Sequence, residues 1–406
     1  ELLNRLVRDW SAIQERFSPD QPLNQVVDIA VGLSDNHKRG RSVAILTFDT
    51  GLKLVYKPKD LGLEVAFGAL LQWCNQNGID LALKFPEVLN FSTHGWVEYI
   101  ESLSCDTEEA VQRFYQRSGM LMCLISTLEG TDCHYENLIA CGEYPVLVDM
   151  ETLLHPEIKS AGAIQTDAST QLAQKLSDSV LRTALLPLKE LSVANDVLSI
   201  DLSGLGKVEE QTVPSLVWKH INTDGMTMDY DTISFVPEAN VPILNGVPVA
   251  PKQFIDEIVT GFEQMYRWLM LHREKLLSQD SPLISFADQE CRLLFRNTRT
   301  YAAILDNSYQ PDLMEVGIAR SVGLDVLSRA FITTPDKPHF WPILAAEKQD
   351  MEQLDIPMLT ANTSSPHLNL GNGNIIRDVF DRSSFERVLS RVQSLDETDL
   401  MFQSQV

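Results

Sequence analysis

The spacing of apolar residues in the first part of the chain predicts a hairpin. Large apolar residues occupy every second position of the run 52–56 (LKLVY), as in a strand that buries one face. The run 42–48 (SVAILTF) before it is rich in β-forming residues, and residues 49–51 (DTG) favour a turn. This pattern predicts two antiparallel strands, with Lys57 near the end of the second.

Beyond residue 58 the apolar spacing changes to the repeat of a helix. One helical face carries Leu63, Phe67, Leu70, Leu71 and Cys74, and Asn77-Gly78 then favours a helix end. A second long helix is predicted from Asp106 to about Leu128, and Asp106 with Glu109 resembles a capping box at its start. Residues 3–17 predict a further helix before the hairpin.

The rest of the chain is less regular. Short strands are predicted at 96–100 and 146–148, and helices at 169–194 and 251–278. A polar helix rich in Arg and Glu is predicted at the end of the chain, and no internal repeat is visible. The longest apolar stretch, 120–125, is far shorter than the roughly 20 residues that a membrane span requires, so we expect no such span.

The charge and the cysteines limit the classes of function. The 406 residues carry a net charge of −23, which disfavours binding to a nucleic acid duplex or to anionic lipid, since both are negative themselves. Six scattered cysteines without a CxxC pair indicate reduced thiols in a cytoplasmic protein, with no zinc site. Against this acidic background, local clusters of basic residues become conspicuous.

The segment 132–137 (DCHYEN), together with Asp149, suggests phosphoryl transfer. This chemistry needs a carboxylate that accepts the proton of the attacking hydroxyl, and an Asn and a second carboxylate that hold Mg²⁺. Asp132, Asn137 and Asp149 supply these groups in a suitable order. An equally simple interpretation is an N-capping Asp beside a structural His.

Lysine and arginine residues offer further candidates. Lys57 has the position of the strand lysine that pairs with nucleotide phosphates in kinases, and Glu64 on the next helix is a possible partner. A basic loop spans 37–41 (HKRGR) and could cover phosphates, or could be an exposed turn. A second basic cluster, at 292–299, could hold a phosphate leaving group, or could pair with carboxylates for structural reasons.

Seven ordered blocks make the chain resemble the dehydratase domain of class II lanthipeptide synthetases, the M-type lanthionine synthetases. The blocks are GLSDNHKRGRSVAILTF, LVYKPKDLGLEVAFGALLQW, WVEYI, GTDCHYENLIACGEYPVLVDMETLLHP, DLSGLG, FRNTRTYAAIL and DIPMLT. The resemblance implies an α+β fold with two lobes, like that of a lipid kinase, which uses ATP and Mg²⁺ to phosphorylate Ser and Thr of a precursor peptide. The same site would then eliminate phosphate to form dehydroalanine and dehydrobutyrine.

The resemblance also implies a role for individual residues. Lys57 would contact the nucleotide phosphates, with Arg41 near them, and Asn137 and Asp149 would hold Mg²⁺. Asp132 would act on the acceptor hydroxyl, and Arg292 with Thr298 would form the elimination pair. The remaining residues expected in the active site are Asp35, His37, His134 and Glu151. Which residue removes the Cα proton is left open by the sequence.

The expected organisation is a nucleotide-binding lobe with N-terminal helices (1–105) and a catalytic lobe (106–406). The second lobe would contain a long, mostly helical insertion at about 156–285, an elimination segment at 284–305 and C-terminal helices. We expect a piece of a larger bacterial synthetase, with a precursor peptide that carries a leader as substrate and a cyclase domain as partner. Two alternatives are a lipid-kinase-like phosphotransferase that never eliminates, and a non-catalytic remnant that binds peptide.

Overall fold

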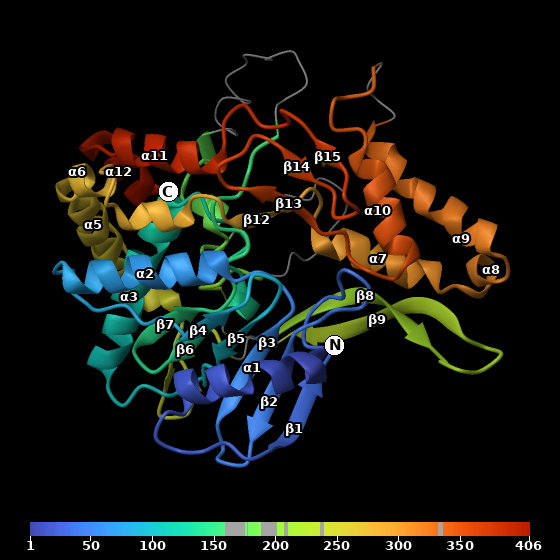
Figure 1. Cartoon of the computed structure of the whole chain (residues 1–406), viewed down its shortest axis with the longest axis horizontal. Coiled ribbons are helices and arrows are strands. Elements are labelled where there is room, and N and C mark those ends of the chain that lie inside the picture. Colours follow the sequence, from blue (N-terminus) through green and yellow to red (C-terminus); the bar gives the residue numbers. More distant parts are fainter. Residues whose placement is uncertain (159–174, 177, 188–200, 207–209, 236–238, 332–335) are drawn as a thin grey trace.

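A computed structural model describes residues 1–158, 175–176, 178–187, 201–206, 210–235, 239–331 and 336–406. Helices and antiparallel sheets are both prominent, as the α+β prediction requires (Figure 1). The helices are α1 (Leu2–Phe17), α2 (Gly62–Gln76), α3 (Glu108–Thr127), α5 (Ile255–Leu271), α6 (Arg273–Leu276), α7 (Thr298–Ser308), α8 (Pro311–Met314), α9 (Gly317–Gly323), α10 (Ile343–Glu352), α11 (Ser384–Ser394) and α12 (Glu397–Gln405). The strands are β1 (Val26–Val31), β2 (Ala44–Phe48), β3 (Lys53–Lys57), β4 (Val88–Asn90), β5 (Gly95–Glu98), β6 (Leu138–Cys141), β7 (Tyr144–Leu147), β8 (Gln211–Lys219), β9 (Thr227–Phe235), β10 (Ile243–Leu244), β11 (Val247–Pro248), β12 (Glu290–Leu293), β13 (Leu359–Asn362), β14 (Leu368–Asn369) and β15 (Ile375–Ile376).

The first sheet has five strands in the order β1-β2-β3-β5-β4. The predicted hairpin is confirmed, because β2 and β3 pair antiparallel with Leu46 opposite Leu54. β3 pairs on its other side with β5, which places Lys57 opposite Gly95. The strands β1 and β4 were not predicted, since β1 buries none of its residues fully and β4 is only three residues long.

Helix α1 covers one face of this sheet and closes a small core with it (Figure 1). Leu6 and Ile13 are buried in this core. One polar group enters it as well: the buried carboxylate of Asp9 accepts a hydrogen bond from Trp96 Nε1 at 3.0 Å and lies 2.6 Å from His94 Nε2. These partners satisfy the buried carboxylate, so the helix is held at one orientation on the sheet.

A larger core lies on the other side of α2 and is built around α3 and α5. The two long helices cross at small residues: a Cβ built on Gly119 would lie 1.9 Å from the carbonyl oxygen of Ile258, and one built on Gly261 would lie 1.8 Å from that of Gln116. The predicted α3 is confirmed, but its N-cap is Thr107, whose side chain accepts from the Ala110 amide. The Asp106–Glu109 capping box was therefore wrong by one position.

The C-terminal part forms a second antiparallel sheet, in the order β12-β13-β14-β15. In Figure 1 this sheet lies above α2, and the first sheet lies below it. Helices α7 and α10, with the turn that follows α9, enclose a third buried cluster beside this sheet. The predicted polar helix at the end of the chain is confirmed as α11 and α12, and α11 begins with a capping box formed by Ser383 and Glu386.

The segment 156–285 contains more strand than the prediction of a mostly helical insertion allowed. Strands β8 and β9, each of nine residues, form an antiparallel hairpin that extends away from the body of the molecule (Figure 1). Their described residues are exposed or half-buried and show no regular apolar alternation, so the sequence pattern was weak. The helix predicted at 251–278 is confirmed as α5 and α6, with a break at His272. The helix predicted at 169–194 falls mostly outside the described residues; residues 180–183 form a short 3-10 turn.

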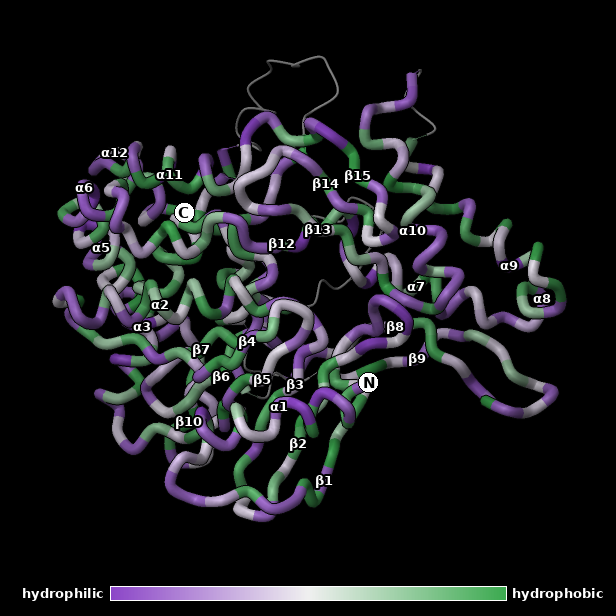
Figure 2. The backbone as a smooth tube through the Cα atoms, viewed as in Figure 1, coloured by the Kyte–Doolittle hydropathy of each residue, from purple (hydrophilic) through white to green (hydrophobic). Residues whose placement is uncertain are grey.

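Hydropathy along the backbone follows the packing. Apolar residues lie mainly on the inward sides of the helices and strands, and polar residues lie in the loops (Figure 2). No described helix combines the length and the apolar character needed to cross a membrane. All six cysteines are free and buried, as expected for reduced thiols.

Candidate active site

The loop 131–137 follows α3 and is braced by its own side chains. Asn137 Nδ2 donates to the backbone oxygen of Asp132 at 2.8 Å, and His134 Nε2 lies 3.8 Å from Asp132 Oδ1. Asp132 has a φ of +62°, a left-handed conformation that costs a non-glycine residue roughly 1–2 kcal/mol. Such conformations are found often at functional sites, where the surrounding structure holds them.

The β6–β7 hairpin brings Asn137 and Asp149 to the same end of one structural unit. Leu138 pairs with Leu147, and the amide of Val148 donates to the backbone oxygen of Asn137 at 3.0 Å. Asp149 follows directly. The eleven residues between the two candidate Mg²⁺ ligands are therefore folded back on themselves, and the two ligands lie at the open end of this hairpin.

Lys57 reaches this end of the hairpin from β3. Its Nζ donates to the backbone oxygen of Val148 at 2.6 Å and lies 3.7 Å from Asp149 Oδ1. Glu64 Oε1, on α2, lies 3.6 Å from the same nitrogen, as expected from the sequence for a strand lysine and a glutamate of the next helix. Both Lys57 and Glu64 are buried, which sets them apart from ordinary surface pairs.

A second lysine, Lys59, was not predicted from the sequence and makes two close ion pairs. Lys59 Nζ lies 2.7 Å from Asp149 Oδ1 and 2.6 Å from Glu151 Oε2. Glu64 Oε1 is 3.9 Å away. The signal in the sequence was limited to proximity, because Lys59 lies two positions after Lys57 in the bend that directly follows β3.

Arg292 enters the cluster from β12. Its Nη1 lies 2.6 Å from Glu151 Oε1, and its backbone amide donates to the backbone oxygen of Glu151 at 2.7 Å. Glu151 thus bridges Arg292 and Lys59. The Nε atom of Arg292 is buried and has no hydrogen-bond partner among the described residues, which leaves one donor available in the site.

Burial and charge shift the acidities of these carboxyl groups in opposite directions. Burial by itself raises the pKa of Asp149 and of Glu151, but the adjacent lysines, and Arg292 in the case of Glu151, outweigh it and lower both values. Burial raises the pKa of Asp132 above its ordinary value, opposed by His134 and Arg292. Asp132 is therefore a more basic carboxylate than Asp149, as a proton acceptor should be.

The basic loop 37–41 is attached to a segment more than 300 residues away. The buried carboxylate of Asp355 accepts the backbone N–H groups of Arg39 and Gly40 at 2.5 and 2.8 Å. His37 Nδ1 lies 2.8 Å from the backbone oxygen of Ile356. Burial and the charge of Arg292 lower the pKa of His37, so its imidazole is neutral at pH 7.

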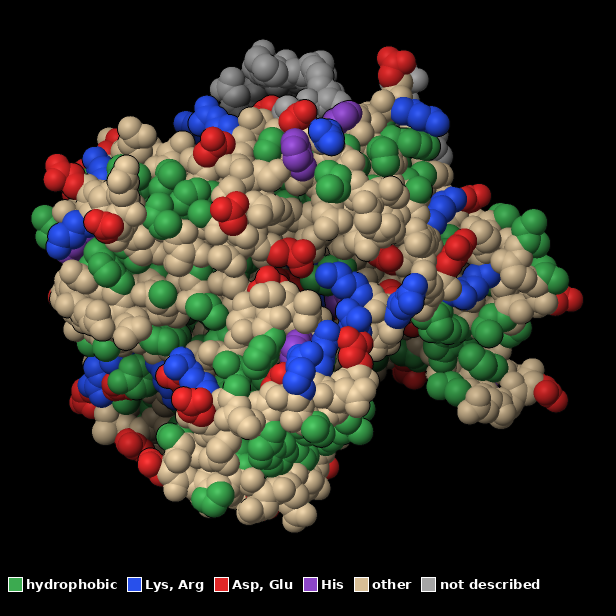
Figure 3. Space-filling view, viewed as in Figure 1, with side chains coloured by type: hydrophobic (Ala, Val, Ile, Leu, Met, Phe, Trp, Pro, Cys, Tyr) green, Lys and Arg blue, Asp and Glu red, His purple; other side chains and the backbone are tan. Residues whose placement is uncertain are grey.

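The side chains of this loop do not converge on the carboxylates. Arg41 Nε pairs with Glu1 at 3.0 Å, and Asp35 is exposed. Lys38 Nζ lies 3.8 Å from Glu290. On the face shown in Figure 3, Lys and Arg side chains nevertheless gather near the middle of the molecule, between the first sheet and the C-terminal sheet. Within this loop, His37 is close enough to Arg292 and Glu151 for their charges to shift its pKa.

The second basic cluster divides into two parts. Arg292 belongs to the site, whereas Arg296 pairs with the buried Glu347 at 2.6 Å and donates to the backbone oxygen of Leu327. Thr298 is the first residue of α7, and within the described part of the chain no hydrogen bond joins it to Arg292. The elimination pair of Arg292 and Thr298 stays a prediction, whereas the structural interpretation holds for Arg296.

The oxygen ligands suit Mg²⁺ better than a transition metal. Among the residues that the structure describes, no group of three or more His, Cys, Asp or Glu side chains could hold a metal ion. Asn137 offers an amide oxygen and Asp149 offers a carboxylate. Mg²⁺ is commonly held by one or two carboxylates together with substrate phosphates. The pair therefore fits an ion that arrives with a nucleotide.

Comparison of the sequence with known proteins shows the family of this chain. Over 329 residues the chain is 26% identical to the "Lacticin 481/lactococcin biosynthesis protein LcnDR2" of Lactococcus lactis subsp. lactis. The match covers 77% of this chain but 34% of that protein, so the chain spans about a third of the relative's length. Residues 1–362, which include every candidate site residue discussed above, match a family described as a domain of unknown function, DUF4135. The chain thus belongs to the DUF4135 family.

Proposed function

We propose that this chain dehydrates Ser and Thr residues of a ribosomally made precursor peptide, in lanthipeptide biosynthesis, by phosphorylation from ATP followed by elimination of the phosphate. The similarity to a lacticin 481 and lactococcin biosynthesis protein supports a role in lanthipeptide biosynthesis. The chemistry is supported by the seven sequence blocks and by the arrangement of buried charges. The lipid-kinase-like description of the fold belongs to the same proposal.

The observation that carries the kinase half is the cluster of Lys57, Glu64 and Asp149, in which the lysine and the glutamate are buried and the aspartate side chain is 28% exposed. A strand lysine paired to a glutamate of the following helix, with a metal-binding Asp nearby, is the arrangement that kinases need before they can transfer phosphate. Here the lysine lies 3.6 Å from the glutamate and 3.7 Å from the aspartate. Lys57 and Glu64 come from the consecutive elements β3 and α2, but Asp149 comes from a distant part of the sequence, after β7. A purely structural ion pair explains this convergence less well.

The protein groups have distinct roles in the phosphorylation step. Lys57 and Lys59 would bind the nucleotide phosphates, and Asn137 and Asp149 would hold Mg²⁺. Bound Mg²⁺ and ATP would supply the phosphoryl group and neutralise its charge. Asp132, whose pKa is raised by burial, would orient the Ser or Thr hydroxyl and accept its proton.

In the elimination step the Cα–H proton leaves, a Cα–Cβ double bond forms and the Cβ–O bond to phosphate breaks. Arg292 would stabilise the departing phosphate through its guanidinium group, which has one unused buried donor among the described residues. Glu151 holds this guanidinium at 2.6 Å and so positions it. Thr298, at the start of α7, would donate a hydrogen bond from its hydroxyl group to the same phosphate.

The precursor peptide is the proposed substrate, and a cyclase is the proposed partner that acts next on its dehydrated residues. We place this chemistry in the bacterial cytoplasm, where ATP is available and thiols stay reduced. Ring closure itself forms no part of the proposed activity of this chain.

Mass spectrometry of a precursor peptide incubated with the protein, ATP and Mg²⁺ tests the proposal. The wild-type protein should produce a loss of about 18 Da per modified residue, the mass of water that dehydration removes. Asp132→Asn should lower the rate of phosphorylation by roughly 10²–10⁴-fold, so that the peptide keeps its mass. Arg292→Lys, which retains charge but not the fork of donors, should let phosphorylated peptide accumulate.

Arg299→Ala is the matched control, because Arg299 is exposed and lies in the same segment as Arg292. This variant should behave like the wild type. Thermal unfolding should accompany each assay, since Arg292 is buried and its replacement can affect folding. Normal dehydration by Asp132→Asn would refute the kinase half. Phosphorylated peptide as the final product of the wild-type protein would favour the phosphotransferase alternative.

A further inference from the structure

A large cavity is lined by residues that the proposed mechanism does not use, some of them sequence neighbours of candidate site residues. Its volume is about 1180 Å³. Glu129 and Thr131, which line it, directly precede Asp132, and the lining residues 293–295 directly follow Arg292. The cavity and the candidate site thus share two backbone segments but are formed by different side chains.

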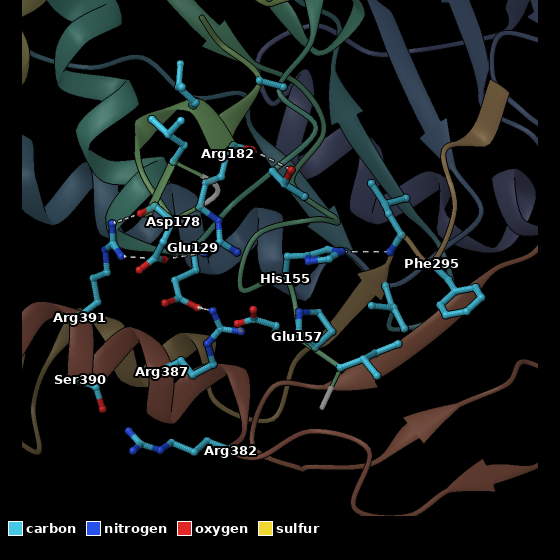
Figure 4. A pocket seen from close by; sticks show the side chains of 18 of the residues that line it. Glu129, His155, Glu157, Asp178, Arg182, Phe295, Arg382, Arg387, Ser390 and Arg391 are labelled. Atoms are coloured by element: carbon cyan, nitrogen blue, oxygen red, sulfur yellow. Dashed lines mark hydrogen bonds and ion pairs between the residues drawn. The ribbon is translucent and has the colours of Figure 1, made fainter. Parts of the chain in front are cut away.

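Four arginines line this cavity: Arg182, Arg382, Arg387 and Arg391 (Figure 4). Arg387 and Arg391 lie one turn apart on α11 and therefore share one helix face. In a chain of net charge −23, such a concentration of arginine is unusual. The described lining contains three carboxylates, Glu129, Glu157 and Asp178, so that positive charge predominates.

The carboxylates leave the arginines only partly satisfied. Glu129 is buried and pairs with Arg387 at 2.8 Å. The side chain of Glu157 is 70% exposed and pairs with Arg387 at 3.0 Å. The side chain of Asp178 is 58% exposed and pairs with Arg391 at 3.2 Å. Exposed carboxylates lose little when they exchange an arginine for water, so a ligand of higher charge can displace them.

Two further groups favour an anionic ligand. Arg387 Nη1 is buried and makes no hydrogen bond of good geometry with a described residue, although Glu157 lies near it. Arg382 is exposed and forms no ion pair within the described residues. Burial, with the charges of Arg182 and Arg387, lowers the pKa of His155 to about 3, so this lining residue adds no charge at pH 7.

We propose that this cavity binds a phosphoryl group carried by a peptide, through Arg382, Arg387 and Arg391. Arginine is suited to this role because its planar fork of donors matches the oxygens of a phosphate. The volume decides between the possible carriers of the phosphate. A cavity of about 1180 Å³ is far larger than a single phosphate needs, and it can hold several residues of peptide. The identification of the natural ligand as a phosphopeptide rests on the proposed function. The affinity of the cavity for a phosphoryl group is independent of that function.

Binding of labelled synthetic peptides to the whole chain tests the inference without ATP, Mg²⁺ or turnover. The probes are a peptide with one phosphoserine, the same peptide with serine, the same peptide with glutamate, and inorganic phosphate. The phosphoserine peptide should bind at least about tenfold more tightly than the other peptides, because its phosphate can accept two or more additional charge-assisted hydrogen bonds from the arginines. The preference should weaken at high salt.

The variants Arg382→Glu and Arg391→Ala should each weaken phosphopeptide binding by about tenfold. Both arginines have only exposed partners or none within the described residues, so the fold should survive their loss. Arg267→Glu on α5 makes the same charge change outside the cavity and should leave binding unchanged.

Unchanged affinity in Arg382→Glu and Arg391→Ala would overturn the site. Equal binding of the glutamate peptide would overturn its preference for phosphate, and binding of inorganic phosphate alone would overturn the assignment to a peptide. Because these measurements need no catalysis, phosphopeptide binding by an inactive protein would support the inference while the proposed function fails.

Discussion

Lys59 is the residue on which most charges of the candidate site depend. It lies within 4 Å of Asp149, Glu151 and Glu64, and its side chain is 13% exposed. Without it, Lys57 and Arg292 would remain to balance Glu64, which is buried, and Asp149 and Glu151, whose side chains are 28% and 18% exposed. Removing one partner of a buried ion pair is costly because the remaining charge stays desolvated.

We predict that Lys59→Gln destabilises the protein by roughly 3 kcal/mol at pH 7. The pKa values of Asp149 and Glu151 are lowered in the folded protein, so their stabilising contribution is present above the unfolded values of about 3.9 and 4.3 and is lost as pH falls further. The difference between wild type and variant should therefore be largest near neutral pH and should narrow in acid. Denaturant unfolding at several pH values measures it.

Lys53→Gln is the control, because the Lys53 side chain is 40% exposed and its Nζ makes surface contacts with the exposed Glu101 at 3.7 Å and with the ring of Tyr99. Its effect should stay below about 1 kcal/mol. If Lys59→Gln and Lys53→Gln have equal effects, Lys59 is not a structural centre of the site.

Asp350 should make the protein less stable as the pH rises. Burial, followed by the nearby charge of Asp355, raises the pKa of Asp350 to about 6. The folded protein then holds more protons than the unfolded chain between about pH 4 and pH 6, so stability falls across this interval. Asp350→Asn should stabilise the protein by about 1–2 kcal/mol at pH 7, after allowance for solvent screening, and should have no effect below about pH 4.

Thermal unfolding from pH 4 to pH 8 would reveal this effect as a Tm difference that appears only on the alkaline side. Asp280→Asn, in an exposed turn, serves as the control. A constant Tm difference between wild type and Asp350→Asn at all pH values would contradict a role for ionisation.

At the scale of elements, the crossing of α3 and α5 determines how closely the main core can pack. Gly119 lets the backbone of α5 approach so far that a methyl group would lie 1.9 Å from the carbonyl oxygen of Ile258. The clash would involve backbone, which has no alternative rotamer. The two helices must therefore separate if any side chain is added.

Gly119→Ala should destabilise the protein by about 3 kcal/mol, in spite of the better helix propensity of alanine. Urea unfolding would show a lower midpoint. Gly317→Ala, on α9, is the matched control, because no atom lies within 4 Å of the added methyl group. This control should be neutral or slightly stabilising, and a similar loss in both variants would argue against the close crossing.

At the scale of the whole molecule, the cysteines report on the integrity of the cores. All six are free and buried, and burial raises the pKa of Cys74 and of Cys291 to about 12. A buried thiol with a raised pKa is a poor nucleophile. The native protein should therefore react slowly with a thiol reagent such as Ellman's reagent, and six thiols should react in denaturant. One or more rapidly reacting thiols in the native protein would contradict the packing described above.

Local patterns were sufficient for the hairpin β2–β3 and for the helices α2, α3 and α5, because each repeats its apolar residues at the period of one element. They failed for β1, which buries no residue fully, and for the exposed hairpin β8–β9. Lys57, Asn137 and Asp149 could be selected because they belong to short motifs with fixed spacing. Lys59 and Asp355 were missed, since their importance depends on partners that lie far away in the sequence.

The sequence by itself determined which residue types are available: two basic clusters in an acidic chain, a loop with Asp132 and Asn137, and the main helices. Only the tertiary structure decided which of these residues meet. It paired Lys57 with Glu64, joined Arg292 to Glu151, directed Arg41 to Glu1 and paired Arg296 with Glu347. The physical reason is that periodicity records which face of an element is buried, whereas ion pairs depend on which elements pack together.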